Sequence, residues 1–125
     1  MKYVFLICTS LLLVACATQD EHYYRTNPKI LDQAVKNCPA QQPPKLSCAQ
    51  LAKIAISVNE LAYQLQINPQ SFGKQILSLQ ETLAQQQVDL AKDPDQLELK
   101  SAIEKNKKQL AERLAIVRWL ESPES

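Results

Sequence analysis

Apolar residues recur every three or four positions along three long stretches of this chain, with polar residues between them. This spacing puts the apolar side chains on one face of an α-helix, so it favours amphipathic helices. Polar residues interrupt the stripes at Gln86 and at Asn106 or Lys107. The stripes comprise Leu51, Ile54, Ala55, Val58, Leu61, Ala62 and Leu65 in the first stretch, Phe72, Ile76, Leu79, Leu83 and Leu90 in the second, and Leu99, Ile103, Leu110, Leu114 and Val117 in the third.

Three dipeptides predict where helices begin: Asn27-Pro28, Asn68-Pro69 and Asp93-Pro94. Asn or Asp accepts hydrogen bonds from the first free amides of a helix, and Pro at the next position loses no helical hydrogen bond. Ser47 is a further candidate cap, and the prolines at 39, 43 and 44 prevent the first helix from continuing. These signals predict four helices, from Pro28 to about Asn37, from near Ser47 to about Ile67, from Pro69 to about Lys92, and from Pro94 to about Glu121.

The fold class that follows is all-α. Alanine, leucine, glutamine, lysine and glutamate dominate, Gly73 is the only glycine, and apolar runs with period two are missing. Short connections make neighbouring helices antiparallel, so we expect a small up-down-up bundle of three long helices with the short first helix packed against the second. Trp119 and Tyr63 are expected to cover the core, and Gly73 to let a neighbouring helix approach near Phe72.

The amino-terminal segment has the pattern of an export signal. Lys2 precedes an apolar run from Tyr3 to Ala15, which is shorter than the roughly 20 residues that a membrane-spanning helix needs. The run ends in Leu13-Val14-Ala15-Cys16, which resembles the lipobox of bacterial lipoproteins. The alternative is an ordinary secretory signal that leaves Cys16 as a free thiol.

The lipoprotein resemblance implies removal of residues 1–15, transfer of a diacylglyceryl group to the Cys16 sulfur and acylation of the new amino terminus. Such a terminus is held firmly in a bilayer, because two anchoring signals already give stable attachment. In this family Asp after the cysteine retains the protein in the inner membrane. Here Ala17 follows, which implies the outer membrane, with the protein facing the periplasm.

Residues 16–26 lack apolar periodicity and are expected to form a lipidated flexible tether ahead of a helical domain over residues 27–125. An extended spacer of ten residues would reach about 33 Å. Its two tyrosines, Tyr23 and Tyr24, could lie at the membrane interface or pack on the domain, and the sequence does not choose between these positions.

Two cysteines remain once Cys8 leaves with the signal and Cys16 carries lipid. In an oxidising compartment we expect Cys38 and Cys48 to form a disulfide, which would link the short helix to the next one. Metal binding by these two cysteines alone is the weaker alternative, because the one histidine, His22, lies far back in the expected tether. Redox catalysis is also disfavoured, because it usually relies on a C-x-x-C spacing.

Charge adds one candidate surface. Removal of residues 1–15 leaves thirteen basic and thirteen acidic side chains, so no basic field for nucleic acid is present. Lys105, Lys107 and Lys108 could form a patch for an anionic partner such as an acidic protein, lipopolysaccharide or cell-wall carboxylates. The alternative is that these bases and the preceding acids complement the helix dipole, with Glu104 pairing to Lys108.

No recognisable catalytic, cofactor or metal motif accompanies these features, so we expect no enzyme. His22 lies in the expected tether, where it could not be held in fixed geometry, and Asp93 and Asp95 have the position of capping residues. In size, anchor and helical content the chain resembles the pilotins that escort secretin subunits, although no pilotin motif is present. We therefore expect an accessory or assembly factor that binds an envelope protein. The alternatives are a self-associating lipoprotein that links outer membrane and cell wall, and a regulator of a cell-wall enzyme.

Overall fold

A computed structural model describes residues 20–122. These residues form helices connected by loops, with no strand in that range. The helices are α1 (Glu21–Arg25), α2 (Pro28–Asn37), α3 (Cys48–Ile67), α4 (Pro69–Lys92) and α5 (Leu97–Glu121). The expected all-α fold is confirmed. The predicted bounds of α2, α3 and α4 agree with the observed bounds to within a residue.

The start predicted for the last helix is wrong by three residues. Asp93 ends α4 instead of starting α5, and its carboxylate Oδ1 accepts a hydrogen bond from the Asp95 amide at 3.4 Å. Asp93, Pro94 and Asp95 therefore belong to the turn between α4 and α5, and Gln96 is the residue before the first turn of α5. An Asp-Pro pair suits both a helix start and a turn, so the dipeptide alone does not separate them.

The other caps explain why the helices start where they do. Ser47 and Gln50 form a capping box: the Ser47 hydroxyl accepts from the Gln50 amide at 3.1 Å, and the Gln50 side chain accepts from the Ser47 amide at 2.8 Å. Asn68 Oδ1 accepts from the Ser71 amide at 3.1 Å. Asn27 makes no such bond to α2, because its side-chain amide instead donates to the Tyr23 carbonyl at 2.8 Å.

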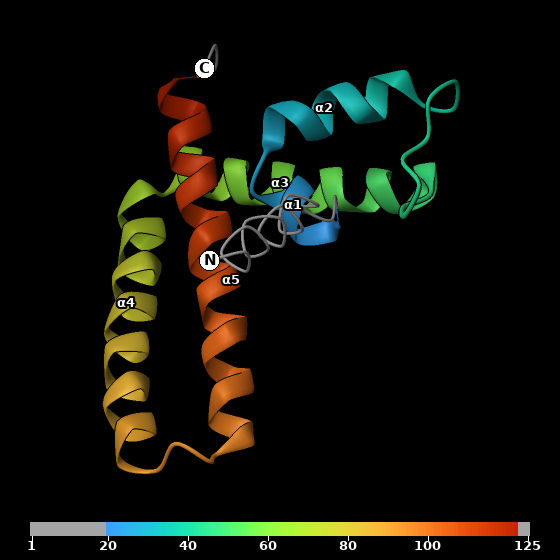
Figure 1. Cartoon of the computed structure of the whole chain (residues 1–125). Coiled ribbons are helices and arrows are strands. Elements are labelled where there is room, and N and C mark those ends of the chain that lie inside the picture. Colours follow the sequence, from blue (N-terminus) through green and yellow to red (C-terminus); the bar gives the residue numbers. More distant parts are fainter. Residues whose placement is uncertain (1–19, 123–125) are drawn as a thin grey trace, which may run out of the picture.

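The helices form a bundle of two antiparallel pairs (Figure 1). The first pair is α2 with α3, and the second is α4 with α5. In Figure 1, α3 lies across the upper part of the α4–α5 pair instead of running alongside it. Only the first turns of α4 and the last turns of α5 therefore reach the other helices, and the rest of this pair extends away from them.

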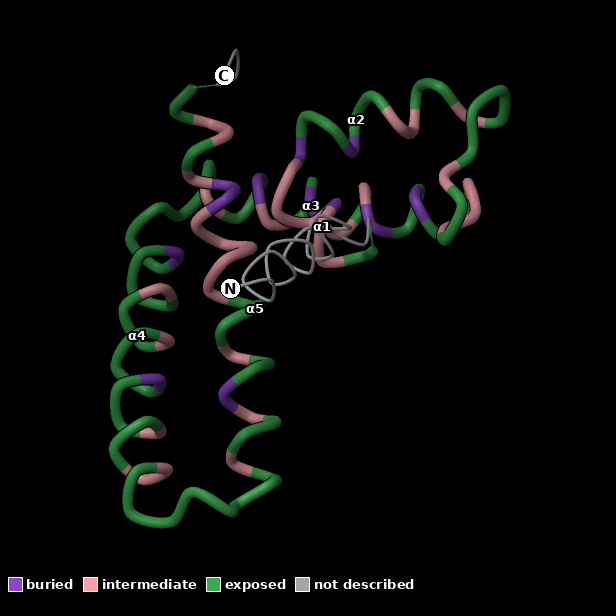
Figure 2. Tube along the Cα trace, viewed as in Figure 1, coloured by how far each residue is buried: buried purple, intermediate pink, exposed green. Residues whose placement is uncertain are grey.

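The main hydrophobic core lies where α3 meets the other helices. It buries side chains from every helix of the described chain, and Figure 2 shows this burial concentrated around α3 and the final turns of α5. The apolar face predicted for residues 47–67 is the face that enters it. The buried members are Tyr24, Leu31, Leu51, Ile54, Val58, Ala62, Phe72 and Ile116.

Residues 77–111 form the projecting part of the α4–α5 pair, here called the hairpin arm. Within it Leu83 and Ile103 are buried between the two helices. The two polar interruptions of the sequence stripes meet here, because Asn106 Nδ2 donates to Gln86 Oε1 at 3.1 Å. A polar residue on one helix is therefore matched by a polar residue on the other, which satisfies both side chains.

The described part of the expected tether is folded, which corrects the predicted boundary at residue 27. Glu21–Arg25 form α1, and Asp20 caps it by accepting from the Tyr23 amide at 2.9 Å. Tyr24 is only 3% exposed and belongs to the main core, and Tyr23 packs against that core. Both tyrosines thus pack on the domain. Burying their aromatic rings away from water stabilises the attachment of α1.

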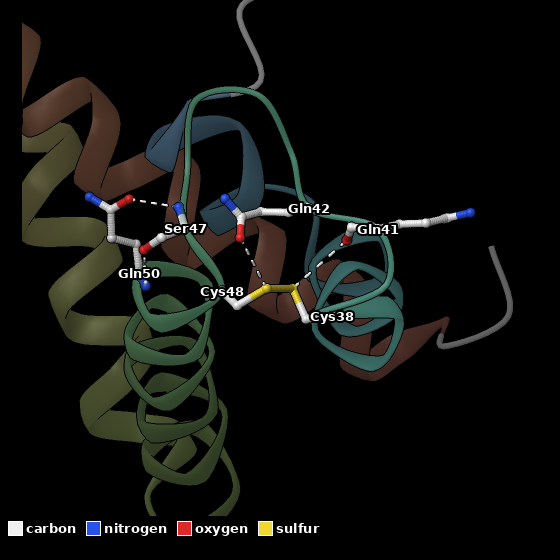
Figure 3. Close-up of a disulfide and its surroundings, with 6 residues drawn as sticks. All are labelled: Cys38, Gln41, Gln42, Ser47, Cys48 and Gln50. Carbon is white, nitrogen blue, oxygen red and sulfur yellow. Dashed lines mark hydrogen bonds between the residues drawn. A yellow bond between two sulfur atoms is a disulfide. The ribbon is translucent and has the colours of Figure 1, made fainter.

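The disulfide expected between Cys38 and Cys48 is present, with the two Cα atoms 5.9 Å apart (Figure 3). It joins the end of α2 to the first residue of α3. Cys38 Sγ lies 3.9 Å from the Gln41 carbonyl oxygen, and Cys48 Sγ lies 3.7 Å from Gln42 Oε1. The proline-rich loop is therefore closed at its base by a covalent link.

Two packing expectations are wrong and one is confirmed. Tyr63 is exposed and does not cover the core. A methyl group added at Gly73 would meet no atom within 4 Å, so no helix approaches there. Trp119 does pack against the core, as expected.

Candidate functional surfaces

The surface around α1 combines paired charges with two lysines of α5. Arg25 binds Glu21 at 2.7 Å within α1, and His22 Nδ1 lies 3.4 Å from Glu112 Oε1 on α5. A hollow between the two helices is lined by Asp20, Glu21, His22, Arg25, Lys108 and Glu112. The His22 contact shows that this residue, placed in the tether by the sequence prediction, helps to attach α1 to α5.

The structure brings together two of the three lysines predicted as an anionic-partner patch. Lys105 and Lys108 are exposed and lie one turn apart on one face of α5. Lys107 lies on a different side of the helix, since residues two apart do not share a face. Its ammonium group is 3.6 Å from Glu104, which corrects the expected pairing of Glu104 with Lys108. The candidate surface therefore contains Lys105 and Lys108.

Arg113 is a half-buried cation that no sequence motif predicts. Its guanidinium carbon lies 5.2 Å from the centre of the Phe72 ring, and its Nη1 atom is buried without a hydrogen-bond partner. Burial lowers the pKa of this guanidinium from its usual value, while the neighbouring Glu112 carboxylate raises it. The ring offsets part of the cost of burying the charge. Arg113 thus serves packing between α4 and α5.

A line of exposed apolar side chains runs along α3 on the side away from the core. Ile56, Tyr63 and Ile67 are each 60–65% exposed. They are seven and four residues apart, so they share one face of the helix over about 16 Å. We call these three residues the α3 line. Single exposed apolar residues are ordinary, but an aligned set is typical of a contact surface.

A second and sparser line lies on α4. Leu77 and Val88 are about half exposed and eleven residues apart, with the exposed Ala84 between them on the same face. This face is turned away from α5, because the α5 side of α4 carries Leu83 and Gln86. We call Leu77, Ala84 and Val88 the α4 line.

Within residues 20–122, no group of three or more His, Cys, Asp or Glu side chains is placed to hold a metal ion. None of the helices described is both long and apolar enough to cross a bilayer. The lipobox and Cys16, the predicted lipid attachment site, lie outside the described residues.

The chain was compared with protein-family models, with curated proteins and with solved structures, and none of them matches it.

Proposed function

We propose that this chain is an outer-membrane lipoprotein, anchored through Cys16, that acts by protein-protein contact as an accessory or assembly factor of an envelope machine such as a secretion system. The observation that carries the contact proposal is the α3 line, where Ile56, Tyr63 and Ile67 face solvent on one side of a helix. Tyrosine is enriched among the few residues that contribute most of the binding free energy in protein interfaces, and the two isoleucines would add apolar contact area around Tyr63.

The proposed occupant of the α3 line is an amphipathic helix of the partner protein. The line is one helix wide, and its spacing matches the apolar stripe that such a helix presents. One border of the line carries charges of opposite sign, Lys53 and Glu60, which are both exposed. A partner helix with complementary charges would be oriented by these two residues, while the apolar contacts supply the affinity.

The test is capture from detergent-solubilised envelopes with the full chain as bait and two matched sets of substitutions. Ile56→Gln, Tyr63→Gln and Ile67→Gln remove the α3 line and keep good helix formers. Leu77→Gln and Val88→Gln remove the α4 line instead. We expect the first set to abolish capture of the envelope partner and the second to retain it. Capture that survives loss of the α3 line would overturn the proposed contact.

The α4 line favours a second candidate function, a self-associating lipoprotein that links the outer membrane to the cell wall. In that case hairpin arms would pair laterally through Leu77 and Val88. Analytical ultracentrifugation of residues 17–125 separates the two candidates. An unsubstituted protein that is already monomeric favours the accessory factor, whereas an oligomer that Leu77→Gln and Val88→Gln dissociate favours the structural lipoprotein.

The anchor is tested separately. Cys16→Ser should abolish labelling with radioactive palmitate and release the protein from sedimented membranes. Unchanged labelling and fractionation would contradict the lipoprotein assignment, whatever the capture experiment gives.

A further inference from the structure

The position of α1 sets how far the domain can lie from a lipid anchor. Only residues 17–19 separate Cys16 from Asp20, the cap of α1. Four successive Cα steps span at most about 14 Å, less than half the reach of a ten-residue spacer. If Cys16 carries lipid, as the proposed function requires, then α1 is held beside the headgroup layer.

Lys105 and Lys108 lie on the face of α5 against which α1 packs. Lys108 lines the hollow that α1 forms with α5, and Lys105 lies one turn away on the same face. The charges of α1 itself are engaged, since Arg25 pairs with Glu21 and His22 contacts Glu112. Among the described residues, neither lysine ammonium group has an ion pair or hydrogen bond. Both are therefore available to an external anion.

We propose that the face formed by α1, Lys105 and Lys108 lies against the phospholipid headgroups of the leaflet that holds the anchor, with the two ammonium groups contacting lipid phosphates. A charge is attracted to a membrane surface only within about 8 Å at physiological ionic strength. The three-residue spacer keeps this face near that range. Asp20 and Glu21 lie on the same face, and lipid phosphates repel their carboxylates. The contact therefore depends on the high effective concentration that the short tether provides.

The geometry predicts which side of the hairpin arm meets lipid. Ser101 is exposed and lies one turn before Lys105, on the same outward face of α5. Val88 lies on the side of α4 turned away from α5, so these two positions point to opposite sides of the arm. They form a matched pair for a contact measurement that leaves both lysines intact.

The experiment places a photo-crosslinking amino acid at Ser101 or at Val88 in the full lipidated chain. The chain is reconstituted in vesicles of phosphatidylethanolamine and phosphatidylglycerol, and lipid adducts are counted by mass spectrometry. We expect the adduct to form predominantly from position 101. Insertion of ten Gly and Ser residues after Thr18 should reduce it. Equal yields at the two positions would overturn the proposal.

Charge variants test the lysines directly. Lys105→Glu and Lys108→Glu should lower the adduct at position 101 by roughly fivefold each. Lys107→Glu, on another side of α5, is the matched control and should leave it unchanged. An equal loss with Lys107→Glu would overturn the role of the two lysines. Palmitate labelling of the same samples separates the two failures, because absence of label overturns the anchor itself, whereas label without the positional difference overturns only the headgroup contact.

Discussion

The main core and the hairpin arm are built from the same kind of helix but are held together differently. In the core, apolar side chains from α1 to α5 meet, and the Cys38–Cys48 disulfide closes the connection between α2 and α3. In the arm, α4 and α5 mainly contact each other, around Leu83, Ile103 and a Gln86–Asn106 hydrogen bond, and the arm meets α1 only near Lys108. The core therefore supplies most of the stabilisation. The arm is held in place because α4 and α5 continue from it into the core.

Stability is therefore distributed unevenly along single helices. A segment with few buried apolar contacts opens at lower free-energy cost than the segment that crosses the core. We expect the amides in the first turns of α4 and the last turns of α5 to be the best protected from hydrogen exchange in their helices.

The largest effect is expected from a pair of identical truncations. Leu51→Ala removes a fully buried core side chain and should lower the free energy of unfolding by about 3 to 5 kcal/mol. Leu83→Ala, in the arm, should lower it by about 2 to 3 kcal/mol, because fewer atoms surround the cavity. Urea unfolding monitored by circular dichroism measures both values, and Leu97→Ala at an exposed position is the control. A larger loss at Leu83 would reverse the ranking.

Removal of the disulfide is the next largest change. Replacing Cys38 and Cys48 together by serine should lower the free energy of unfolding by about 2 to 3 kcal/mol, because the loop gains freedom in the unfolded chain. Hydrogen exchange should report the loss mainly in α2, with the arm unchanged. Faster exchange in residues 77–111 would mean that the core and the arm are more tightly coupled than their contacts indicate.

Substitutions in the Gln86–Asn106 pair of the arm should change the stability by a smaller amount. The single substitution should lower it, and the double substitution should reverse that loss. Gln86→Leu alone leaves Asn106 without its partner and should cost about 1 kcal/mol. Gln86→Leu with Asn106→Leu should restore or exceed the original stability, since two apolar side chains then fill the same space. Thermal unfolding of the original protein, of Gln86→Leu, of Asn106→Leu and of the double variant completes the double-mutant cycle. Equal losses for the single and double variants would show that the hydrogen bond contributes little.

The smallest effect concerns pH and α1. Burial raises the pKa of the Tyr24 phenol above its usual value, and Tyr23 raises it further. The unfolded chain therefore loses this proton at lower pH than the folded chain does. The stabilisation is complete below about pH 10 and is lost as the pH rises through the folded pKa. Tyr24→Phe should remove this alkaline loss in urea unfolding between about pH 8 and pH 11, and Tyr63→Phe, at an exposed tyrosine, is the matched control.

The regular helices could be predicted from the sequence because their signals are local. Apolar spacing identified the core faces of α3 and α4, and Asn68-Pro69 and Ser47 located two helix starts. The polar interruptions at Gln86 and Asn106 were visible as well, but their pairing depends on the register between two helices. That register is a property of the assembled bundle, and the sequence of either helix alone does not determine it.

The misplaced features share a different physical cause. Tyr24 lies in a five-residue helix that is too short to show a period, so only tertiary packing determines its burial. The aromatic ring of Tyr63 predicts a core position, although its spacing from Ile56 and Ile67 marks a second face of α3. That spacing was the available signal for the α3 line. The grouping of Lys105, Lys107 and Lys108 followed their closeness in sequence instead of their positions around α5.

One unbroken helix, α5, runs from the tip of the arm to the centre of the core. Its 25 residues correspond to a rod about 38 Å long, and Ile116, near one end, is fully buried. A rod fixed at one end acts as a lever. We expect a force applied near Leu97 to be transmitted as torque to the side chains packed around Ile116 in the core.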